Sequence, residues 1–312
     1  MCALDFPGRL VSWSLMLCCV FVAPARGEAG PDAVEVSAIE VPASDPATVE
    51  VGVVRWLTSY TEAYAAAQES RQMLLINFVP LGESSQQSSL EAKIAADESL
   101  RERLGGFTLL RLQDETPGEG PASRLLGHAA FSPMKGDSGV AVLDLASQGE
   151  EYSGRVVSAF PYRSGKYYRW QCDYLPVILG LPQGTLSQRT MVWAVRVHPE
   201  RPASTGGEMH PGIADAAGRH SAYQASIRNQ GHHNWGRRSG EIQSMAGTFK
   251  AVEVVAESWP NQDLIDSCLD CVASWRHSSG HWGAVRSPHR LYGYDIRRGS
   301  NGIWYGTGIF AD

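Results

Sequence analysis

Three short segments in the last third of the chain carry residues that could bind a metal. They are residues 231–235 (GHHNW), 252–256 (VEVVA) and 275–281 (WRHSSGH). Two neutral imidazoles and one carboxylate form a ligand set that suits zinc or another divalent metal and leaves a position open for water. An open position permits Lewis-acid chemistry or simple ligand capture. The same histidines could instead only hydrogen-bond to the backbone and line a groove.

The elements that must position these segments follow from the spacing of apolar residues. Residues 213–225 and 263–275 have helical spacing, so each histidine segment follows the end of a predicted helix. Residues 291–296 and 303–310 are typical of two strands, and the turn at 298–302 joins them into a closing hairpin.

Taken in order, these segments resemble the CAP superfamily, which comprises cysteine-rich secretory proteins, antigen 5 and plant pathogenesis-related proteins. The resemblance covers about residues 189–312. It rests on a helix that ends at a histidine, a Glu-x-x-Ala segment, Trp-x-x-Ser-x-Gly-His, a Gly-containing strand and a final Trp-Tyr-x-Thr-x-x-Phe strand. Several elements in a fixed order are harder to obtain by chance than any single motif.

The resemblance implies an α-β-α sandwich with a cleft that binds a divalent metal such as zinc through two histidines and two acids. Carried over to this chain, the metal ligands are His233 (or its neighbour His232), Glu253 and His281. The family's second acid is replaced here by a serine, and another acid could lie nearby. The residues implied to line the cleft or support the ligands are His232, Glu257, Ser278, Trp275 and Trp304. The remaining histidines, expected at the surface or behind the ligands, are His220, His277 and His289.

Strands and helices alternate in the first half of the chain. The pattern predicts helices at 62–72 and 89–104, and strands at 73–79, 107–112 and 140–144. Such alternation favours a small α/β layer domain.

This pattern resembles the thioredoxin-like fold over about residues 54–181. Where that family has Cys-x-x-Cys, residues 80–89 (PLGESSQQSS) contain no cysteine, and where it has a cis-proline, residues 136–139 read GDSG. Without a thiol there is no thiolate nucleophile and no mixed disulfide. We therefore expect a redox-inactive scaffold.

Glycine and proline at residues 179–186 indicate a domain junction. The predicted fold class is α/β and α+β, with a thioredoxin-like domain lacking Cys-x-x-Cys at 54–185 and a CAP (SCP-like) domain at 186–312. Residues 187–197 open the second domain as either a helix or a strand.

The N-terminal residues 1–27 are typical of a secretory signal peptide, with Arg9, an apolar run at 10–24 and an Ala-x-Ala-like end. Cleavage near residue 25 or 27 would make the protein secreted or periplasmic. An uncleaved membrane anchor is the alternative, and lipidation at the Cys18-Cys19 pair is a weaker third. Residues 28–53 show no sustained helical period and are predicted to be a flexible lead-in.

Three cysteines remain after cleavage, namely Cys172, Cys268 and Cys271. Cys268 and Cys271 are three residues apart on a predicted helix, where a bridge would be strained, so we expect two buried thiols on one helix face. Disulfide exchange through this possible thiol pair is the alternative, and it needs exposed thiols with a lowered pKa.

The composition limits the classes of partner. A chain of 312 residues with 43% hydrophobic content can bury a sizeable core. The formal charge is −6, and removing Asp5, Arg9 and Arg26 with the signal peptide makes it −7, which argues against nucleic acid. No nucleotide cofactor is expected.

The function that we expect is binding of an envelope or extracellular ligand, which could be a lipid, a glycan or a protein. The alternative is a metal-dependent hydrolase that acts on envelope peptide or glycan and uses His233, Glu253 and His281 to hold an activated water. Some aromatic residues could also stack on sugar rings or sterols, although aromatic residues are more often core. These are Trp235, Trp259, Trp282, Trp304 and Tyr305.

Overall fold

The computed structural model describes residues 48–51 and 54–312. The predicted signal peptide and most of the predicted lead-in lie outside the described residues. Within the described part of the chain, no helix is both long and apolar enough to cross a membrane.

The first sheet has both parallel and antiparallel strands, in the order β1-β2-β4-β3-β5-β6. Strands β2, β4 and β3 are parallel to one another, whereas β5 and β6 are antiparallel additions and β1 forms a hairpin with β2. The strands are β1 (Thr48–Val51), β2 (Val54–Leu57), β3 (Met73–Phe78), β4 (Phe107–Leu112), β5 (Gly139–Leu143) and β6 (Val156–Pro161).

Helices pack on both faces of this sheet because its central strands are apolar on both sides. In β3, Leu74, Ile76 and Phe78 belong to one buried cluster and Leu75 belongs to another, as the two-residue repeat of a strand requires. The first cluster includes residues of α1 (Tyr60–Ser70), α4 (Pro121–Leu126) and the 3-10 helix η1 (Ala129–Met134). The second includes residues of α2 (Ser85–Ala96), α3 (Glu98–Leu104) and α5 (Tyr174–Leu179).

The second sheet has the order β7-β9-β10-β8. Its strands are β7 (Glu208–Met209), β8 (Ala251–Glu257), β9 (Leu291–Arg298) and β10 (Trp304–Ala311). The predicted closing hairpin is confirmed, since β9 and β10 are antiparallel neighbours. Strand β8 pairs with β10 alone and therefore forms an edge of this sheet.

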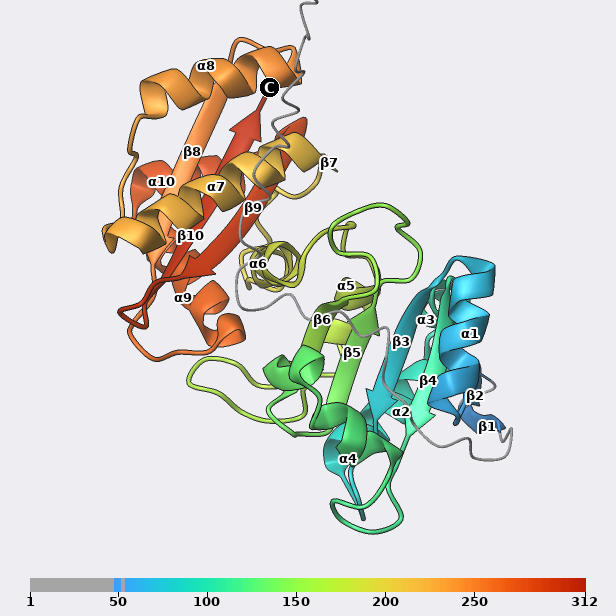
Figure 1. Ribbon diagram of the computed structural model, residues 1–312. Coiled ribbons are helices and arrows are strands. Elements are labelled where there is room, and N and C mark those ends of the chain that lie inside the picture. The colour runs from blue at the N-terminus through green and yellow to red at the C-terminus, as the bar shows by residue number, and fades with distance from the viewer. Residues whose placement is uncertain (1–47, 52–53) are drawn as a thin grey trace, which may run out of the picture. The chain divides into compact units, whose positions relative to one another are not determined.

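Helices cover both faces of the second sheet as well (Figure 1). Helices α7 (Pro211–Ile227) and α8 (Trp235–Ala246) lie on one face, and α9 (Leu264–Arg276) and α10 (Ser279–Arg286) lie on the other. Helix α7 packs directly on β9, because a Cβ atom at Gly293 would lie 2.3 Å from the backbone nitrogen of Ala214.

Residues 187–197, which the sequence left open between helix and strand, mostly belong to helix α6 (Leu186–Arg196). Thr185 and Gln188 form a capping box at its start. Within α6, Arg189 is buried, and its guanidinium donates to the carbonyl oxygens of Val157 at 3.1 Å and of Pro182 at 2.6 Å. Burial lowers the pKa of Arg189 to about 10.

A second set of contacts joins α9 to the segment after β6. The buried carboxylate of Asp266 accepts hydrogen bonds from the backbone N–H groups of Lys166, Tyr167 and Tyr168 at 2.7 to 2.8 Å. At Gly165 a Cβ atom would lie 2.3 Å from an oxygen of that carboxylate, so this position has no room for a side chain.

Several sequence expectations were wrong in detail. The single helix predicted at 89–104 is two helices, because Asp97 is extended and caps the N-terminus of α3 through the N–H of Leu100. The lead-in predicted to be flexible to residue 53 contains β1. Helices α8 and α10 were not predicted, since each contains two glycines, which lower helix propensity. The broad class of a mixed α/β protein is confirmed.

The burial of Arg189 gives a test of the packing around α6. Replacing it in Arg189→Met removes the donors and leaves buried carbonyl oxygens without partners, so we expect the free energy of unfolding to fall by about 3 kcal/mol or more. Urea denaturation measures this. The matched change Arg237→Met, at a side chain that is 81% exposed, should alter the free energy by no more than about 0.5 kcal/mol. Equal losses in the two variants would contradict this role of Arg189.

Candidate functional site

Glu253 lies on the edge strand β8, and its carboxylate is fully buried. The guanidinium of Arg238, from α8, binds both oxygens of this carboxylate, with Nη1 at 2.5 Å from Oε2 and Nη2 at 2.9 Å from Oε1. The same guanidinium donates through Nε to the carbonyl oxygen of His233 at 2.9 Å. A two-pronged pair of this kind fixes direction as well as charge, so Glu253 and Arg238 set the geometry of this edge.

Two imidazoles meet beside this carboxylate. His232 has its Nδ1 2.9 Å from Oε1 of Glu253, and its Nε2 lies 3.3 Å from Nε2 of His281. Because a carboxylate accepts the proton of Nδ1, the neutral His232 ring carries a free lone pair on Nε2, which points at His281. We call His232 and His281 the histidine pair.

The loop that carries His232 is fixed against β8 by residues of α7. His220, buried on α7, has its Nε2 2.9 Å from the carbonyl oxygen of Gly231 and 3.8 Å from Oε1 of Glu253. The side chain of Gln224 accepts from the N–H of Gly231, and Gln230 donates to the carbonyl oxygen of Val255 on β8. His281 comes from the first turn of α10, so α10 and the α7–α8 loop both supply a ring at the edge of β8.

His233, the ligand named first from the sequence, turns away from this group. Its Nε2 lies 3.2 Å from the carbonyl oxygen of Asn229, and its ring contacts Tyr223 edge-on with centroids 5.6 Å apart. Of the three predicted ligands, the structure therefore brings Glu253 and His281 together with His232, the stated neighbour, instead of His233.

None of the other residues named from the sequence forms a side-chain hydrogen bond or ion pair with the histidine pair. Glu257 is exposed at the end of β8, four residues from Glu253. Ser278 precedes α10 and makes no side-chain cap. Trp275 and Trp304 are core residues, and the indole N–H of Trp304 donates to the carbonyl oxygen of Gln262.

The histidine pair has a spacing that suits a metal. Two nitrogen ligands about 2.05 Å from a tetrahedral zinc ion stand about 3.3 Å apart, and the two Nε2 atoms are 3.3 Å apart. However, within residues 48–51 and 54–312, no cluster of three or more His, Cys, Asp or Glu side chains is placed to hold an ion. The reason is that Glu253 is held by Arg238 and bonds to the other nitrogen of His232, where it can support a ligand without being one.

Burial sets the charge state of two of these rings. It lowers the pKa of His281, and the neighbouring His232 lowers it further. Burial also lowers the pKa of His220, against the opposing effect of Glu253. Both rings are therefore held toward the neutral form, which is the form that binds metals.

Neither thiol of the predicted pair has the properties that exchange chemistry needs. Cys268 and Cys271 are free and fully buried on α9, and burial raises the pKa of both thiols. A thiolate is disfavoured in such surroundings. Two buried thiols on one helix face, the preferred interpretation, agree with this arrangement.

Most of the aromatic residues proposed for stacking are occupied in the core. Trp282, Trp304 and Tyr305 are buried, whereas Trp259 is 63% exposed. Trp235 is half-buried, with the guanidinium carbon of Arg238 5.2 Å from its ring centroid. Of these aromatic residues, Trp259 is therefore the one best exposed for stacking on a ligand.

Sequence reasoning missed one residue of this group and placed another only broadly. Arg238 belongs to helix α8, which was not predicted, and an arginine on an unrecognised helix carries no signal of its own. His220 was expected at the surface or behind the ligands, and it is buried behind them. The sequence feature that indicates its burial is its position on the apolar face of α7, the helix that precedes His232.

Comparisons with protein-family models, with curated proteins and with solved structures give no match to this chain.

The buried carboxylate predicts a large effect of a small change. In Glu253→Gln the charge that compensates Arg238 is lost, so we expect the free energy of unfolding to drop by about 3–5 kcal/mol. Urea denaturation checks this, with Glu241→Gln as the matched control because that side chain is 61% exposed. A loss below about 1 kcal/mol for Glu253→Gln would show that the pair is screened by water.

The two lowered histidine pKa values predict a fall in stability with acid. The unfolded chain takes up protons at His220 and His281 at a higher pH than the folded protein does, so their contribution is complete above about pH 6.5 and is lost progressively as the pH falls below it. The midpoint of urea unfolding should therefore drop as the pH is lowered from about 6.5. The drop should be smaller in the double variant His220→Gln/His281→Gln, and an unchanged drop would contradict the assignment.

Proposed function

We propose that this chain is an exported protein whose C-terminal part is a CAP-type ligand-binding domain, with a divalent metal held by His232 and His281. The observation that carries the proposal is the pair of facing Nε2 atoms, 3.3 Å apart, with Glu253 behind His232. Binding, and not turnover, is the activity that we infer.

The layers of the fold support both parts of the predicted architecture. For the second half, the CAP resemblance implies a sheet with helices on both faces and an antiparallel hairpin at the end of the chain. The second sheet and the β9–β10 hairpin agree with this. For the first half, a parallel β2-β4-β3 group extended by antiparallel β5 and β6 is compatible with the thioredoxin-like arrangement that we propose. The segment between β3 and α2 contains no cysteine, which supports a scaffold role for that half.

The metal would be held by the two Nε2 atoms, with the remaining positions filled by water or by donors of the ligand. Bound there, it would supply a Lewis-acidic centre for an oxygen of the ligand. Glu253 keeps the proton of His232 on Nδ1, and Arg238 keeps the carboxylate in place. Zinc is the ion that we expect, because imidazole nitrogens suit it and the spacing fits a tetrahedral edge.

What favours binding over hydrolysis is the state of Glu253. A metal-dependent hydrolase needs a base that can take a proton from water. Both oxygens of Glu253 are occupied by Arg238 and His232, and the carboxylate is closed to solvent. The hydrolase alternative therefore lacks its base at the residue that the sequence offered for it.

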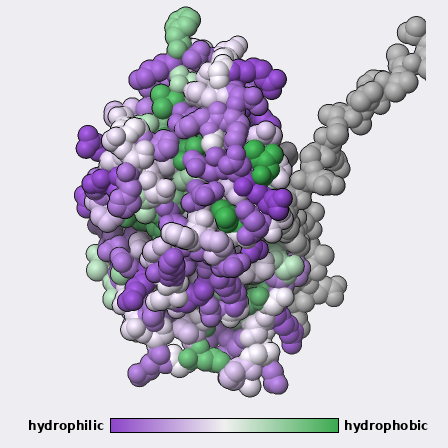
Figure 2. All heavy atoms as spheres, turned by 90° about the vertical axis from the view of Figure 1, so that its left-hand side faces the viewer, coloured by the Kyte–Doolittle hydropathy of each residue, from purple (hydrophilic) through white to green (hydrophobic). Residues whose placement is uncertain are grey.

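The surface around the site favours a ligand with polar groups. The left-hand side of Figure 1, where α10 and the α7–α8 loop lie, faces the viewer in Figure 2. Hydrophilic residues predominate on this face, and hydrophobic ones are scattered without forming a broad patch (Figure 2). Of the expected ligands, we therefore favour a glycan, a protein or a lipid head group over a lipid bound through its acyl chains.

A zinc titration by calorimetry on protein stripped of metal tests this function. We expect one zinc ion per chain, with the affinity lowered about 10-fold or more in His232→Ala and in His281→Ala. His233→Ala is the matched control, because it removes the adjacent imidazole, whose Nε2 faces Asn229 instead of the pair. Its affinity should stay within about 2-fold of that of the unaltered protein, since it removes no proposed ligand.

Two results would contradict the proposal. One is the absence of any zinc binding in the unaltered protein. The other is binding that falls equally in all three variants, which would place the ion elsewhere or make the histidines interchangeable surface ligands.

A further inference from the structure

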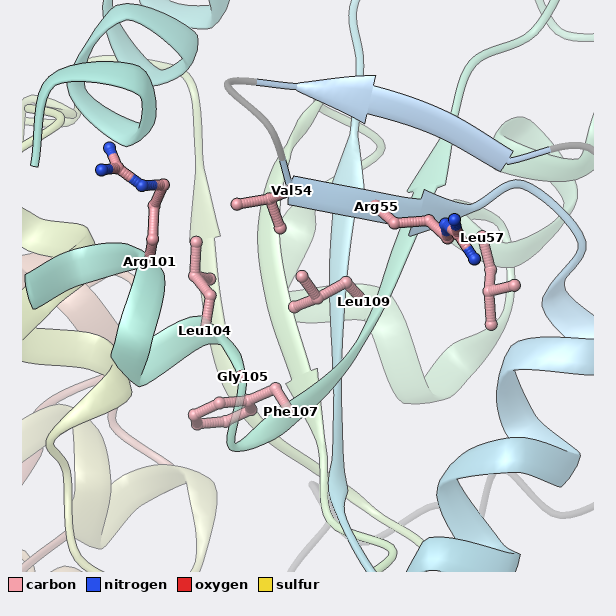
Figure 3. A pocket seen from close by; sticks show the side chains of 8 residues that line it. All are labelled: Val54, Arg55, Leu57, Arg101, Leu104, Gly105, Phe107 and Leu109. Carbon is pink, nitrogen blue, oxygen red and sulfur yellow. The ribbon is translucent and has the colours of Figure 1, made fainter. Parts of the chain in front are cut away.

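A surface cavity of about 490 Å³ lies far along the chain from the histidine pair, beside the hairpin of β1 and β2. It is lined by residues of β2, the end of α3 and the start of β4. These residues are Val54, Arg55, Leu57, Arg101, Leu104, Gly105, Phe107 and Leu109 (Figure 3). We call this cavity the β2–β4 notch.

The notch exists because two neighbouring strands diverge. Strands β2 and β4 are parallel, but they pair only where Leu57 meets Leu110. From there toward Phe107 the strands separate, and Figure 3 shows β2 running across the view while β4 runs obliquely away from it. Among the residues that the structure describes, Phe107 to Leu109 have strand partners in β3 alone. Alternate peptide groups on this stretch of β4 therefore face the notch without a strand to bond to.

The walls of the notch are apolar, and its charged residues are cationic. Val54 and Leu109 extend toward Leu104 in Figure 3, and Phe107 closes the lower end. Arg55 has no hydrogen bond or ion pair with another described residue, and Glu50, opposite it in the hairpin register, is not within ion-pair distance.

Arg101 adds a second positive charge at the notch. It donates to the carbonyl oxygens of Ile94 and Ala95 at the end of α2, and no described carboxylate pairs with it. The open strand edge, the apolar walls and the two arginines without a carboxylate partner together fit an extended peptide that carries acidic and apolar side chains.

We propose that the notch is the docking site of residues 34–41 of this same chain. Their sequence is VEVSAIEV, in which each glutamate stands between two β-branched residues. β-branched residues favour strands, and glutamates complement the two arginines. Residues 28–47 contain five acids and neither lysine nor arginine, so the whole region matches the charge of the notch.

The connection is long enough for this contact. Strand β1 begins at Thr48, which stands opposite Leu57 in the hairpin, so the residues before β1 start from the end of β2 that pairs with β4. Six residues, 42–47, separate the docking segment from β1, and they can span up to about 20 Å. The four-residue β2 is only about 13 Å long. The segment therefore reaches either end of the notch. This inference is independent of the metal and ligand proposal.

Hydrogen–deuterium exchange on the full chain tests the docking. Adding the segment as a strand would protect the amides of residues 107–109 that face the notch, and reversing its acids should expose them. We expect these amides to exchange at least about tenfold faster in Glu35→Lys/Glu40→Lys than in the unaltered chain. Asp32→Lys/Asp45→Lys changes the net charge equally outside the run, and it should leave their exchange unchanged.

A charge exchange across the contact makes the test specific. Arg55→Glu alone should also speed exchange, and combining it with Glu35→Lys/Glu40→Lys should slow exchange below that of either parent variant. Exchange in Glu35→Lys/Glu40→Lys that equals that of the unaltered chain would overturn the proposal. Protection that increases with protein concentration would also overturn it, by assigning the notch to the segment of a second copy.

Discussion

A carboxylate placed where water cannot reach it must find cations or hydrogen-bond donors nearby, and Glu253 finds both. Arg238 donates hydrogen bonds to both of its oxygens, and Nδ1 of His232 bonds to one of them. This arrangement also determines the state of the neighbouring histidine, because the bond to Nδ1 leaves Nε2 of His232 as its free nitrogen. That nitrogen faces His281, so the buried carboxylate of Glu253 sets the direction in which the histidine pair meets.

Two other buried charged groups, Arg189 and Asp266, are also satisfied by hydrogen bonds. Arg189 is buried among carbonyl oxygens from the start of β6 and the segment after α5, and Asp266 is buried among three backbone N–H groups. Each charge is satisfied by peptide dipoles instead of a counter-ion. Because such groups are costly to leave unpaired, they specify one arrangement of helix and loop where apolar packing alone would tolerate several.

The sequence predicted elements better than it predicted their contacts. Strands β3, β4 and β5 and the closing hairpin follow from segments rich in apolar residues, and α7 and α9 follow from their helical spacing. Glu253 and His281, both named from the sequence as ligands, lie in one group with His232 in the structure. Which of two adjacent histidines joins them depends on how the chain leaves α7. The His232 ring bonds to Oε1 of Glu253 and the His233 ring to the carbonyl oxygen of Asn229, and no pattern in the sequence encodes this. Arg238 was missed because the two glycines of α8 lower its helix propensity, so the helix that carries this arginine was not predicted.

The most direct test of this account is the protonation of the His232 ring, read from nitrogen-15 NMR of its two nitrogens at a pH of about 8, where histidines are neutral. If the buried carboxylate directs the ring, the proton resides on Nδ1 and Nε2 is unprotonated, and Glu253→Gln changes this distribution. A ring that carries its proton on Nε2, or a distribution that is the same in Glu253→Gln, would contradict the claim that Glu253 prepares the histidine pair for a ligand.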